Sequence, residues 1–375
     1  MRVLLTGGGT GGHIYPALAI AKYLQRKEKQ VEILYVGTER GLESDIVPRS
    51  GFTFRTIEVS GLKRSLSFDT IKTFWKLTKG IRQAHSIIRE FKPDIVIGTG
   101  GYVCAPVLFV ARLMGHLTVI HEQNVYPGLT NRFLSRFVHR VCISFADAEK
   151  YLSKYKQKVI LTGNPRASEV IQVDKDSAHR AGTELGLDRK LKTVVVVSGS
   201  RGAKPINEAV MNMLEEVARQ DVFQLLYITG KVHYDEIMKR VRDKKLDKAR
   251  TILVRPFVYE MPELLSQTDL LIGRAGASTI AELTAMGVPA VFIPSPYVTA
   301  NHQELNARWV VEHGGGVMIR ESELTGKRLF DTVFSLVSNP QQLAAMSESS
   351  RTLGMPDALE NIYRVMKELL TVTKT

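Results

Sequence analysis

Cysteine, long apolar runs and acidic side chains are all scarce in this chain of 375 residues. Its two cysteines, Cys104 and Cys142, are too few for a disulfide framework and lack the spacing of metal ligands, so we expect a reducing compartment. No run of about 18 uncharged apolar residues occurs, and Met1 and Arg2 lead directly into a strand and a glycine loop. The sequence therefore predicts neither a membrane-spanning helix nor a secretion signal.

Acidic residues are outnumbered, since 38 Asp and Glu stand against 51 Lys and Arg and give a net charge of +13. Such an excess indicates an anionic partner: nucleic acid, a phosphorylated metabolite or the acidic leaflet of a membrane. The excess is largest between Leu62 and Lys92, where eight basic residues accompany two acidic ones. Helical spacing in this range predicts an apolar stripe that packs in a core, formed by Ile71, Phe74, Leu77, Ile81, Ala84 and Ile88.

The same 62–92 region also has the composition of a membrane-surface patch. Trp75 lies at the edge of the apolar stripe, beside Lys72, Lys76 and Lys79. Apolar anchors surrounded by cations are typical of segments that bind the interface of an anionic bilayer. We therefore expect this region to contact an anionic membrane leaflet.

Strand-like runs alternate with helical segments along the chain. The first series falls at 3–6, 32–36, 94–97, 118–121, 140–143 and 159–161. After a polar stretch at 172–192, expected to be a linker with a short helix, a second series falls at 193–197, 224–228, 251–255, 270–272 and 290–293, and a last helix is expected at 357–370. This alternation predicts parallel sheets with helices on both faces and two nucleotide-fold domains in tandem. Ligands of such sheets bind beyond the carboxyl ends of the strands, which in two facing domains would line one cleft.

Glycine-rich turns follow four of the predicted strands, at 7–12, 98–102, 198–203 and 273–279. Glycine permits close backbone approach, and a helix that starts at such a turn presents free N–H groups to an anion. Gly7, Gly9 and Gly12 also match the dinucleotide fingerprint, although that match alone is weak. Four such turns in paired domains favour phosphate chemistry.

The turn at 273–279 carries the most specific pattern. Ser278 and Thr279 fall at the expected start of a helix, and Glu282 follows three residues after Thr279. This spacing places a carboxylate one turn along the helix, where it could accept both hydroxyls of a ribose. The alternative is that Glu282 closes a capping box with Thr279.

Together these motifs resemble those of the MurG family, the peptidoglycan transferases that add N-acetylglucosamine to lipid I and make lipid II. The matching segments run in order from residue 1 to beyond 306: GGGTGGHIYPALA, IGTGGYV, IHEQN, TGNPR, SGSRGA, RAGASTIAEL and NHQELNA. The resemblance implies the GT-B fold, an α/β architecture in which two Rossmann-like doubly wound domains face each other across a cleft. It implies an acceptor and membrane-side domain at 1–164, to which a helix at 355–375 returns, and a UDP-sugar domain at 165–354.

The resemblance also implies partners and site residues. The partners are UDP-N-acetylglucosamine and undecaprenyl-pyrophosphoryl muramoyl-pentapeptide (lipid I), at the cytoplasmic face of a bacterial cell membrane to which the protein binds peripherally; nucleic acid is not expected. By motif position the substrate-binding residues are Thr10, Gly11, Gly12, Tyr102, Asn124, Arg166, Ser200, Val258, Ala277, Ser278, Thr279, Glu282, His302, Gln303 and Asn306. His302 departs from family members that carry two successive glutamines.

The implied reaction is attack of the muramoyl 4-hydroxyl on the anomeric carbon of the sugar nucleotide, with inversion and release of UDP. His13, at the end of the first glycine loop, is the candidate general base because an unperturbed imidazole has a pKa of about 6.5. His121 and Glu122 are reserve candidates, since their segment leaves a strand end. The alternative for His13 is that it caps a helix or binds substrate without transferring a proton.

The sequence predicts no metal site and no bound cofactor. Its one Asp-x-Asp pair, Asp174 and Asp176, lies in the polar stretch rather than after a strand, so we expect it to be solvated. Helix dipoles, the Ser200 region and arginines would then neutralise the leaving diphosphate.

Other functions are weaker matches. A UDP-N-acetylglucosamine 2-epimerase would use the same paired domains without a lipid acceptor. An NAD-dependent oxidoreductase needs a ribose-binding acid about 20 residues after the loop, whereas Glu39 comes later and the second glycine-loop domain has no role. A basic protein that binds nucleic acid or membrane without catalysis would explain the charge but none of the glycine turns.

Overall fold

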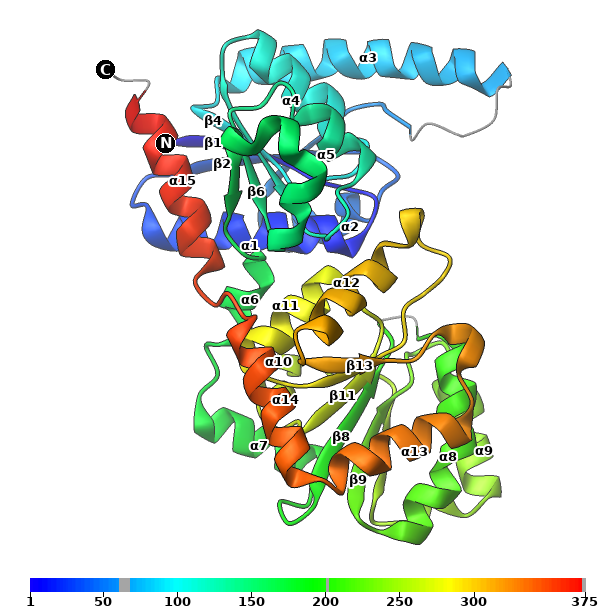
Figure 1. Cartoon of the computed structure of the whole chain (residues 1–375). Helices are drawn as coiled ribbons and strands as arrows, with labels where there is room; N and C mark the ends of the chain where they lie inside the picture. The colour runs from blue at the N-terminus through cyan, green and yellow to red at the C-terminus, as the bar shows by residue number, and fades with distance from the viewer. Residues whose placement is uncertain (61–67, 200–201, 373–375) are drawn as a thin grey trace. The chain divides into compact units, whose positions relative to one another are not determined.

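The computed structural model describes residues 1–60, 68–199 and 202–372, with the backbone alone at 68–74 and 76. The chain divides into two compact units, one formed by Met1–Glu169 with Pro356–Thr375 and the other by Val170–Met355. Each unit has one parallel sheet (Figure 1). Within the described ranges, no helix has both the length and the apolar character that crossing a bilayer requires.

The first unit contains a seven-stranded sheet in the order β3-β2-β1-β4-β5-β6-β7, and all of its paired strands are parallel. The strands are β1 (Arg2–Thr6), β2 (Glu32–Gly37), β3 (Thr53–Thr56), β4 (Ile95–Gly98), β5 (Leu117–Glu122), β6 (Arg140–Ile143) and β7 (Val159–Leu161). The strand order reverses between β1 and β4, which is the point where open α/β sheets bind ligands.

Helices cover both faces of this sheet. They are α1 (Gly11–Lys27), α2 (Glu43–Arg49), α3 (Phe68–Phe91), α4 (Cys104–Leu113), α5 (Leu129–Leu134), η1 (Ala146–Lys158) and α15 (Ala358–Val372), whereas α6 (Pro165–Val170) lies at the boundary of the two units in the chain. Because side chains alternate along a strand, Val3 and Leu5 join a core with α1, α2 and α15, whereas Leu4 joins a core with α3, α4 and α5. The predicted final helix is thus present and packs on the first unit.

The second half of helix α3 packs on the core of the first unit. Ala84 and Ile88 are 1% and 0% exposed in the core, as the stripe predicts. Leu77 is 37% exposed, so its assignment to the core stripe is wrong, and Trp75 is 68% exposed. The side chains of Ile71 and Phe74 are not among those described, and residues 62–67 lie outside the described ranges.

The second unit contains a six-stranded parallel sheet in the order β10-β9-β8-β11-β12-β13. The strands are β8 (Lys192–Val197), β9 (Phe223–Ile228), β10 (Ile252–Arg255), β11 (Leu270–Gly273), β12 (Ala290–Phe292) and β13 (Gly316–Met318). The helices are α7 (Lys175–Leu185), α8 (Lys204–Gln220), α9 (Tyr234–Asp243), η2 (Leu246–Lys248), α10 (Met261–Leu265), α11 (Ala277–Met286), η3 (Thr299–Asn301), α12 (His302–Glu312), η4 (Glu321–Glu323), α13 (Gly326–Val337) and α14 (Pro340–Thr352). The two sheets repeat the predicted doubly wound pattern.

The polar stretch at 172–192 is part of the second unit rather than a linker. Helix α7 begins after Asp174, whose side chain accepts the Ser177 N–H at 3.1 Å, and it packs against α10. Gly182 lies against the side chain of Gln267, which follows α10, since a Cβ there would lie 2.2 Å from the side-chain oxygen of Gln267. Asp174 and Asp176 are both exposed, which confirms that the Asp-x-Asp pair is solvated.

Candidate functional site

Three neighbouring strands of the first unit end at one edge of its sheet, and each leads into a sequence motif. Strand β1 leads into the first glycine loop, β4 into the turn at 98–102, and β5 into the segment at 121–125. Gly101 has φ +88, and a Cβ there would lie 2.3 Å from the Gly8 carbonyl oxygen. Glycine is therefore required where the second turn crosses the first loop, and the Gly8 N–H donates to the Gly100 carbonyl at 3.2 Å.

A buried carboxylate, Glu43 of α2, holds the first glycine loop in place. Its Oε2 accepts the Gly9 N–H at 3.0 Å, while its Oε1 accepts the N–H and the hydroxyl of Thr38 at 3.1 and 2.6 Å. Glu43 is 0% exposed, and a Cβ on Gly8 would lie 2.6 Å from its Oε1. Glu43 is not among the predicted site residues, because a glutamate at a helix start is usually explained by the helix dipole.

His13 lies where the first loop meets the turn at 98–102. Its Nδ1 is 3.0 Å from the Gly8 carbonyl oxygen and 3.4 Å from the Thr10 hydroxyl, and its own carbonyl accepts the Thr99 hydroxyl at 2.7 Å. A carbonyl can only accept, so the Gly8 contact places a hydrogen on Nδ1, which in the neutral imidazole is the Nδ1–H tautomer. In that tautomer Nε2 carries the lone pair that a general base needs.

His121 is enclosed by the protein. It is 1% exposed, its Nε2 lies 2.9 Å from the Gly163 carbonyl oxygen, and its Nδ1 lies 3.0 Å from Nε2 of Gln123. These contacts fit the neutral ring that donates from Nε2 and accepts at Nδ1. Burial lowers the pKa of His121 to about 4. We propose that this reserve base candidate instead fixes the loop after β5.

Glu122 binds the same loop. Its side chain is 2% exposed, and it accepts hydrogen bonds from the N–H of Asn124 at 2.9 Å, the N–H of Gly128 at 3.0 Å and Nδ2 of Asn131 at 2.8 Å. Nδ2 of Asn124 also reaches Oε1 of Glu122 at 3.3 Å. The second reserve candidate therefore orients Asn124, which sequence analysis assigns to substrate binding.

The remaining predicted residues of the first unit surround this edge. Thr10 precedes α1 without capping it through its side chain, Gly11 and Gly12 begin the helix, and its first turn holds no acidic residue. Helix N-termini of this kind attract anions. Tyr102 lies beside Gly9, since a Cβ on Gly9 would be 3.8 Å from its ring.

Arg166 is tied to neighbouring side chains. It is the second residue of α6 and forms an ion pair with Glu169. Its guanidinium carbon lies 5.9 Å from the centre of the Tyr15 ring. Its backbone N–H donates to the side chain of Asn164 at 3.1 Å.

In the second unit, two buried hydroxyls lie at the carboxyl ends of the adjacent strands β8 and β11. The Oγ atoms of Ser198 and Ser278 have no hydrogen-bond partner among the described residues. Buried polar atoms are rarely left unsatisfied, so both positions fit contacts to a ligand. Ser278 is one of the predicted site residues and Ser198 is not, while the predicted Ser200 lies outside the described residues.

Helix α11 begins at Ala277, and the residue that caps it is Gly276. Thr279 is therefore the third residue of the helix, so it does not form the capping box with Glu282 that was the alternative explanation. Glu282 is four residues after Ser278 and shares its face of the helix. Arg274 is occupied elsewhere, because it donates to the Ile293 carbonyl at 3.0 Å and pairs with Glu321.

The start of α12 holds the other predicted contacts to the sugar. Nδ1 of His302 lies 2.8 Å from the Thr299 carbonyl oxygen, and Oε1 of Gln303 accepts the Ser295 N–H at 2.9 Å. Asn306 is 0% exposed and donates to the Ala275 carbonyl at 3.3 Å, which ties α12 to the start of α11. Val258 lies in the separate turn after β10 and is 4% exposed.

Metal-ligand geometry is absent from the described ranges, in which no three His, Cys, Asp or Glu side chains are grouped to hold an ion. Both cysteines are free and buried, and burial raises the pKa of each thiol to about 12. These thiols are therefore poor nucleophiles and poor ligands.

Two doubly wound units, each with glycine turns and helix starts at the carboxyl ends of its central strands, define a nucleotide-sugar transferase fold of the GT-B type. The chain matches the N-terminal domain of glycosyltransferase family 28 over residues 3–143 and the C-terminal domain of the same family over residues 193–362, and it belongs to this family. The predicted fold class is thus confirmed.

Two relatives of the chain are named UDP-N-acetylglucosamine–N-acetylmuramyl-(pentapeptide) pyrophosphoryl-undecaprenol N-acetylglucosamine transferase. The protein from Bacillus pumilus is 49% identical over 99% of this chain and 100% of its own length, and that from Bacillus subtilis is 49% identical over 98% and 99%. The crystal structure of MurG from Acinetobacter baumannii superposes with a TM-score of 0.77 at 27% identity, covering 98% of this chain and 99% of that one. The resemblance to the MurG family is confirmed.

A UDP-N-acetylglucosamine 2-epimerase from Neisseria meningitidis shares the fold, with a TM-score of 0.67 at 14% identity over 98% of this chain and 100% of that one. At that identity the likeness concerns the fold alone.

Proposed function

We infer that the chain transfers N-acetylglucosamine from UDP-N-acetylglucosamine to the 4-hydroxyl of the muramoyl residue of lipid I, with inversion, giving lipid II for peptidoglycan synthesis. The observation that carries this inference is 49% identity along the whole chain to transferases named for that reaction. The glycine turns and helix starts of both units supply the phosphate contacts that two diphosphate substrates need.

For the donor, we propose the carboxyl edge of the second sheet. The N–H groups at the start of α11 and the hydroxyl of Ser278 would bind the diphosphate, and Glu282 would accept the ribose hydroxyls. The backbone near Val258 would bind the uracil, while His302, Gln303 and Asn306 would lie against the sugar. The unpartnered hydroxyls of Ser198 and Ser278 support this placement. As the bond to the anomeric carbon breaks, helix dipoles stabilise the charge on the departing UDP.

For the acceptor, we propose the first unit, with His13 as the general base. The acceptor oxygen attacks the anomeric carbon, its proton passes to Nε2 of His13, and the electron pair of the broken carbon–oxygen bond leaves with UDP. The Gly8 carbonyl supports this role because it keeps hydrogen on Nδ1, so Nε2 of the neutral ring is the nitrogen that can accept the proton. Thr10, Gly11, Gly12, Tyr102, Asn124 and Arg166 would bind substrate around it.

We also propose that the first unit binds the anionic cytoplasmic leaflet of the bacterial membrane, where its lipid-linked acceptor resides. Trp75 and Leu77 of α3 are exposed, as are Leu113 of α4 (72%) and Leu129 of α5 (74%). Helix α3 packs against α4, and α4 against α5. Exposed apolar side chains on neighbouring helices, with the cations of the 62–92 region, fit an interfacial contact.

The test of function is incubation with UDP-N-acetylglucosamine and a lipid I analogue. We expect a β-1,4-linked disaccharide product and release of UDP. An epimerase would instead convert the sugar nucleotide in the absence of acceptor, so product analysis without the lipid separates the two activities. Formation of the 2-epimer without acceptor, with no disaccharide when acceptor is added, would refute the transferase assignment.

A further inference from the structure

The turn before α12 has an uncommon backbone. Ala300 (φ 54, ψ 24) and Asn301 (φ 50, ψ 33) are both in the left-handed region, although neither is glycine. Asparagine tolerates this conformation because its side chain can form local hydrogen bonds, whereas the methyl group of alanine cannot. Two such residues in succession persist only where surrounding contacts hold them, and such turns concentrate at functional sites.

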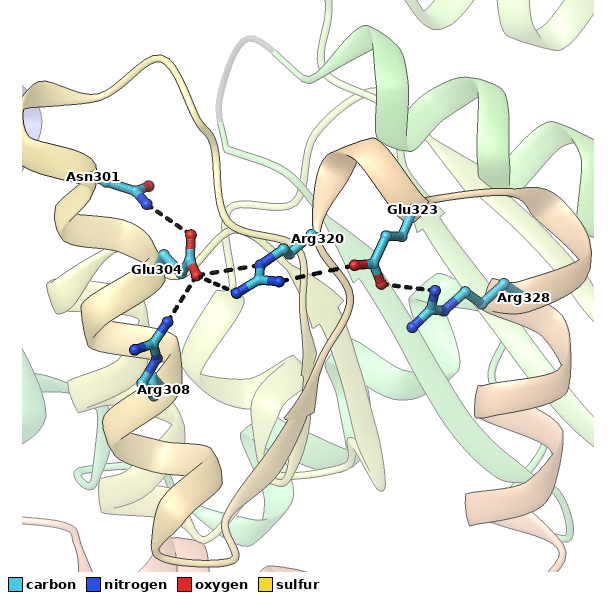
Figure 2. Close-up of polar contacts among 6 residues, drawn as sticks. All are labelled: Asn301, Glu304, Arg308, Arg320, Glu323 and Arg328. Carbon is cyan, nitrogen blue, oxygen red and sulfur yellow. Dashed lines mark hydrogen bonds and ion pairs between the residues drawn. The ribbon is translucent and has the colours of Figure 1, made fainter.

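Glu304 supplies those contacts (Figure 2). Its Oε2 accepts Nδ2 of Asn301 at 2.7 Å, and its Oε1 accepts Nη2 of Arg308 at 2.9 Å and Nη2 of Arg320 at 3.0 Å. Hydrogen bonds from Asn301 and Arg320 lower the pKa of Glu304, so it is ionised near neutral pH. The carboxylate is only 17% exposed, although it lies in the first turn of a surface helix.

The contacts of Glu304 extend from α12 to the segment that follows β13. Nη1 of Arg320 lies 4.0 Å from Oε1 of Glu323, and Nη1 of Arg328 on α13 lies 2.7 Å from Oε2 of Glu323 (Figure 2). Arg320 and Glu323 precede α13 in the chain, whereas Asn301 precedes α12. Glu304 and Arg320 thus connect the left-handed turn to the segment between β13 and α13.

The two residues between Asn301 and Glu304 are His302 and Gln303. Because Oε1 of Gln303 accepts the Ser295 N–H, its amide nitrogen is the end that can donate to a sugar hydroxyl. His302 is anchored by its Nδ1 contact with the Thr299 carbonyl. The direction of both side chains therefore depends on the path of the backbone through Ala300 and Asn301.

We propose that Glu304 is a positioning residue for the sugar of the donor: by holding the left-handed turn, it sets the placement of His302 and Gln303 without touching substrate. The proposal rests on the proposed function, in which those two residues lie against N-acetylglucosamine. Glu304 acts on the sugar end of the site, so UDP, which lacks the sugar, should bind independently of it.

The experiment measures the affinity for UDP and for UDP-N-acetylglucosamine by calorimetry, and the KM and kcat of transfer. Glu304→Ala should weaken binding of the sugar nucleotide and raise its KM by about tenfold, the scale of losing one charge-assisted hydrogen bond. Its affinity for UDP should stay within about twofold of wild type. Glu312→Ala, an exposed glutamate at the other end of α12, is the matched control and should change neither affinity.

A second pair of variants separates backbone control from general destabilisation. Asn301→Ala loses the bond to Glu304 and strains the backbone, so it should resemble Glu304→Ala. Asn301→Gly loses the same bond but adopts the left-handed conformation freely, so it should retain sugar-nucleotide affinity within about threefold. This pair leaves the ion pairs of Glu304 intact and stays informative even if Glu304→Ala folds poorly.

Equal weakening for UDP and UDP-N-acetylglucosamine in Glu304→Ala, or no change in either, would overturn the positioning role. So would an Asn301→Gly variant as weak as Asn301→Ala. A wild-type protein that binds UDP-N-acetylglucosamine no better than UDP and forms no disaccharide would overturn the proposed function itself, which separates the two failures.

Discussion

Replacing Glu43 by glutamine should loosen the first glycine loop while leaving the second unit intact. The carboxylate accepts three hydrogen bonds, two at Oε1 from Thr38 and one at Oε2 from the Gly9 N–H. A glutamine can keep its single oxygen toward Thr38, but its NH₂ group then faces the Gly9 N–H. Two donors would point at each other in a site that is 0% exposed, where water cannot replace the lost acceptor.

The magnitude follows from that single lost bond. A hydrogen bond to a charged group contributes about 1.5–3 kcal/mol, and a buried donor without a partner carries a similar penalty. If the ordered loop is needed to bind and deprotonate the acceptor, kcat/KM for transfer should fall by roughly 10- to 100-fold, since about 1.4 kcal/mol corresponds to a factor of ten. The free energy of unfolding of the first unit should fall by about the same 1.5–3 kcal/mol.

The assay combines steady-state transfer to a lipid I analogue, calorimetric binding of UDP and urea unfolding. Glu39→Gln is the matched control, because this glutamate lies in the same loop after β2 but is exposed. UDP affinity should be unchanged in both variants. A Glu43→Gln variant with kcat/KM within twofold of wild type, or one whose UDP affinity falls together with its activity, would refute the argument.

Three further predictions concern the first unit. His13→Ala should lower turnover by about 10²–10⁴-fold while preserving UDP binding, as measured by single-turnover kinetics, and a loss below about fivefold would contradict the base assignment. Because burial lowers the pKa of His121 to about 4, unfolding takes up a proton below pH 6.5, so stability should fall as the pH decreases from about 6.5 to 4. Urea titrations should show about 2 kcal/mol lost to this residue between pH 7 and 5, and a His121→Asn variant with the same pH slope as wild type would exclude that origin. Charge reversal at Lys72, Lys76 and Lys79 should abolish sedimentation with anionic vesicles, whereas reversal at Lys22, Arg26 and Lys29, on and just after α1, should not; unchanged binding in the first variant would argue against the membrane contact.

Most strands could be predicted from the sequence because their apolar runs are continuous, as expected for strands buried on both faces. Two strands were missed, and both lie at sheet edges. Strand β3 (Thr53–Thr56) is largely exposed and has no apolar run, while β13 (Gly316–Met318) starts in a glycine series that resembles a turn. The other two edge strands, β7 and β10, were predicted because each carries an apolar run, so β3 and β13 were missed for want of that run and only their pairing revealed them.

The candidate site could be predicted where a motif has a specific spacing, and not where a residue type is common at its position. Glycine turns and Ser278 were recognisable because their spacing suits a phosphate at a helix start. Ser198 and Glu43 were not, because a serine after a strand and a glutamate at a helix start are common in many proteins. Their burial and contacts, which depend on segments distant in the chain, distinguish them in the structure.

Three glutamates of this basic chain make similar contacts, and these contacts bear on how its sites bind anions. Glu43, Glu122 and Glu304 are each largely buried, and each accepts at least three hydrogen bonds, of which at least one comes from a loop beside a predicted site residue. A carboxylate near a diphosphate site would repel the ligand if its charge were directed at it. Here backbone N–H groups, amides, the Thr38 hydroxyl and, at Glu304, two guanidinium groups donate to the carboxylate oxygens. The charge is therefore directed at these donors, and substitution at these positions should alter geometry and selectivity more than the attraction for phosphate.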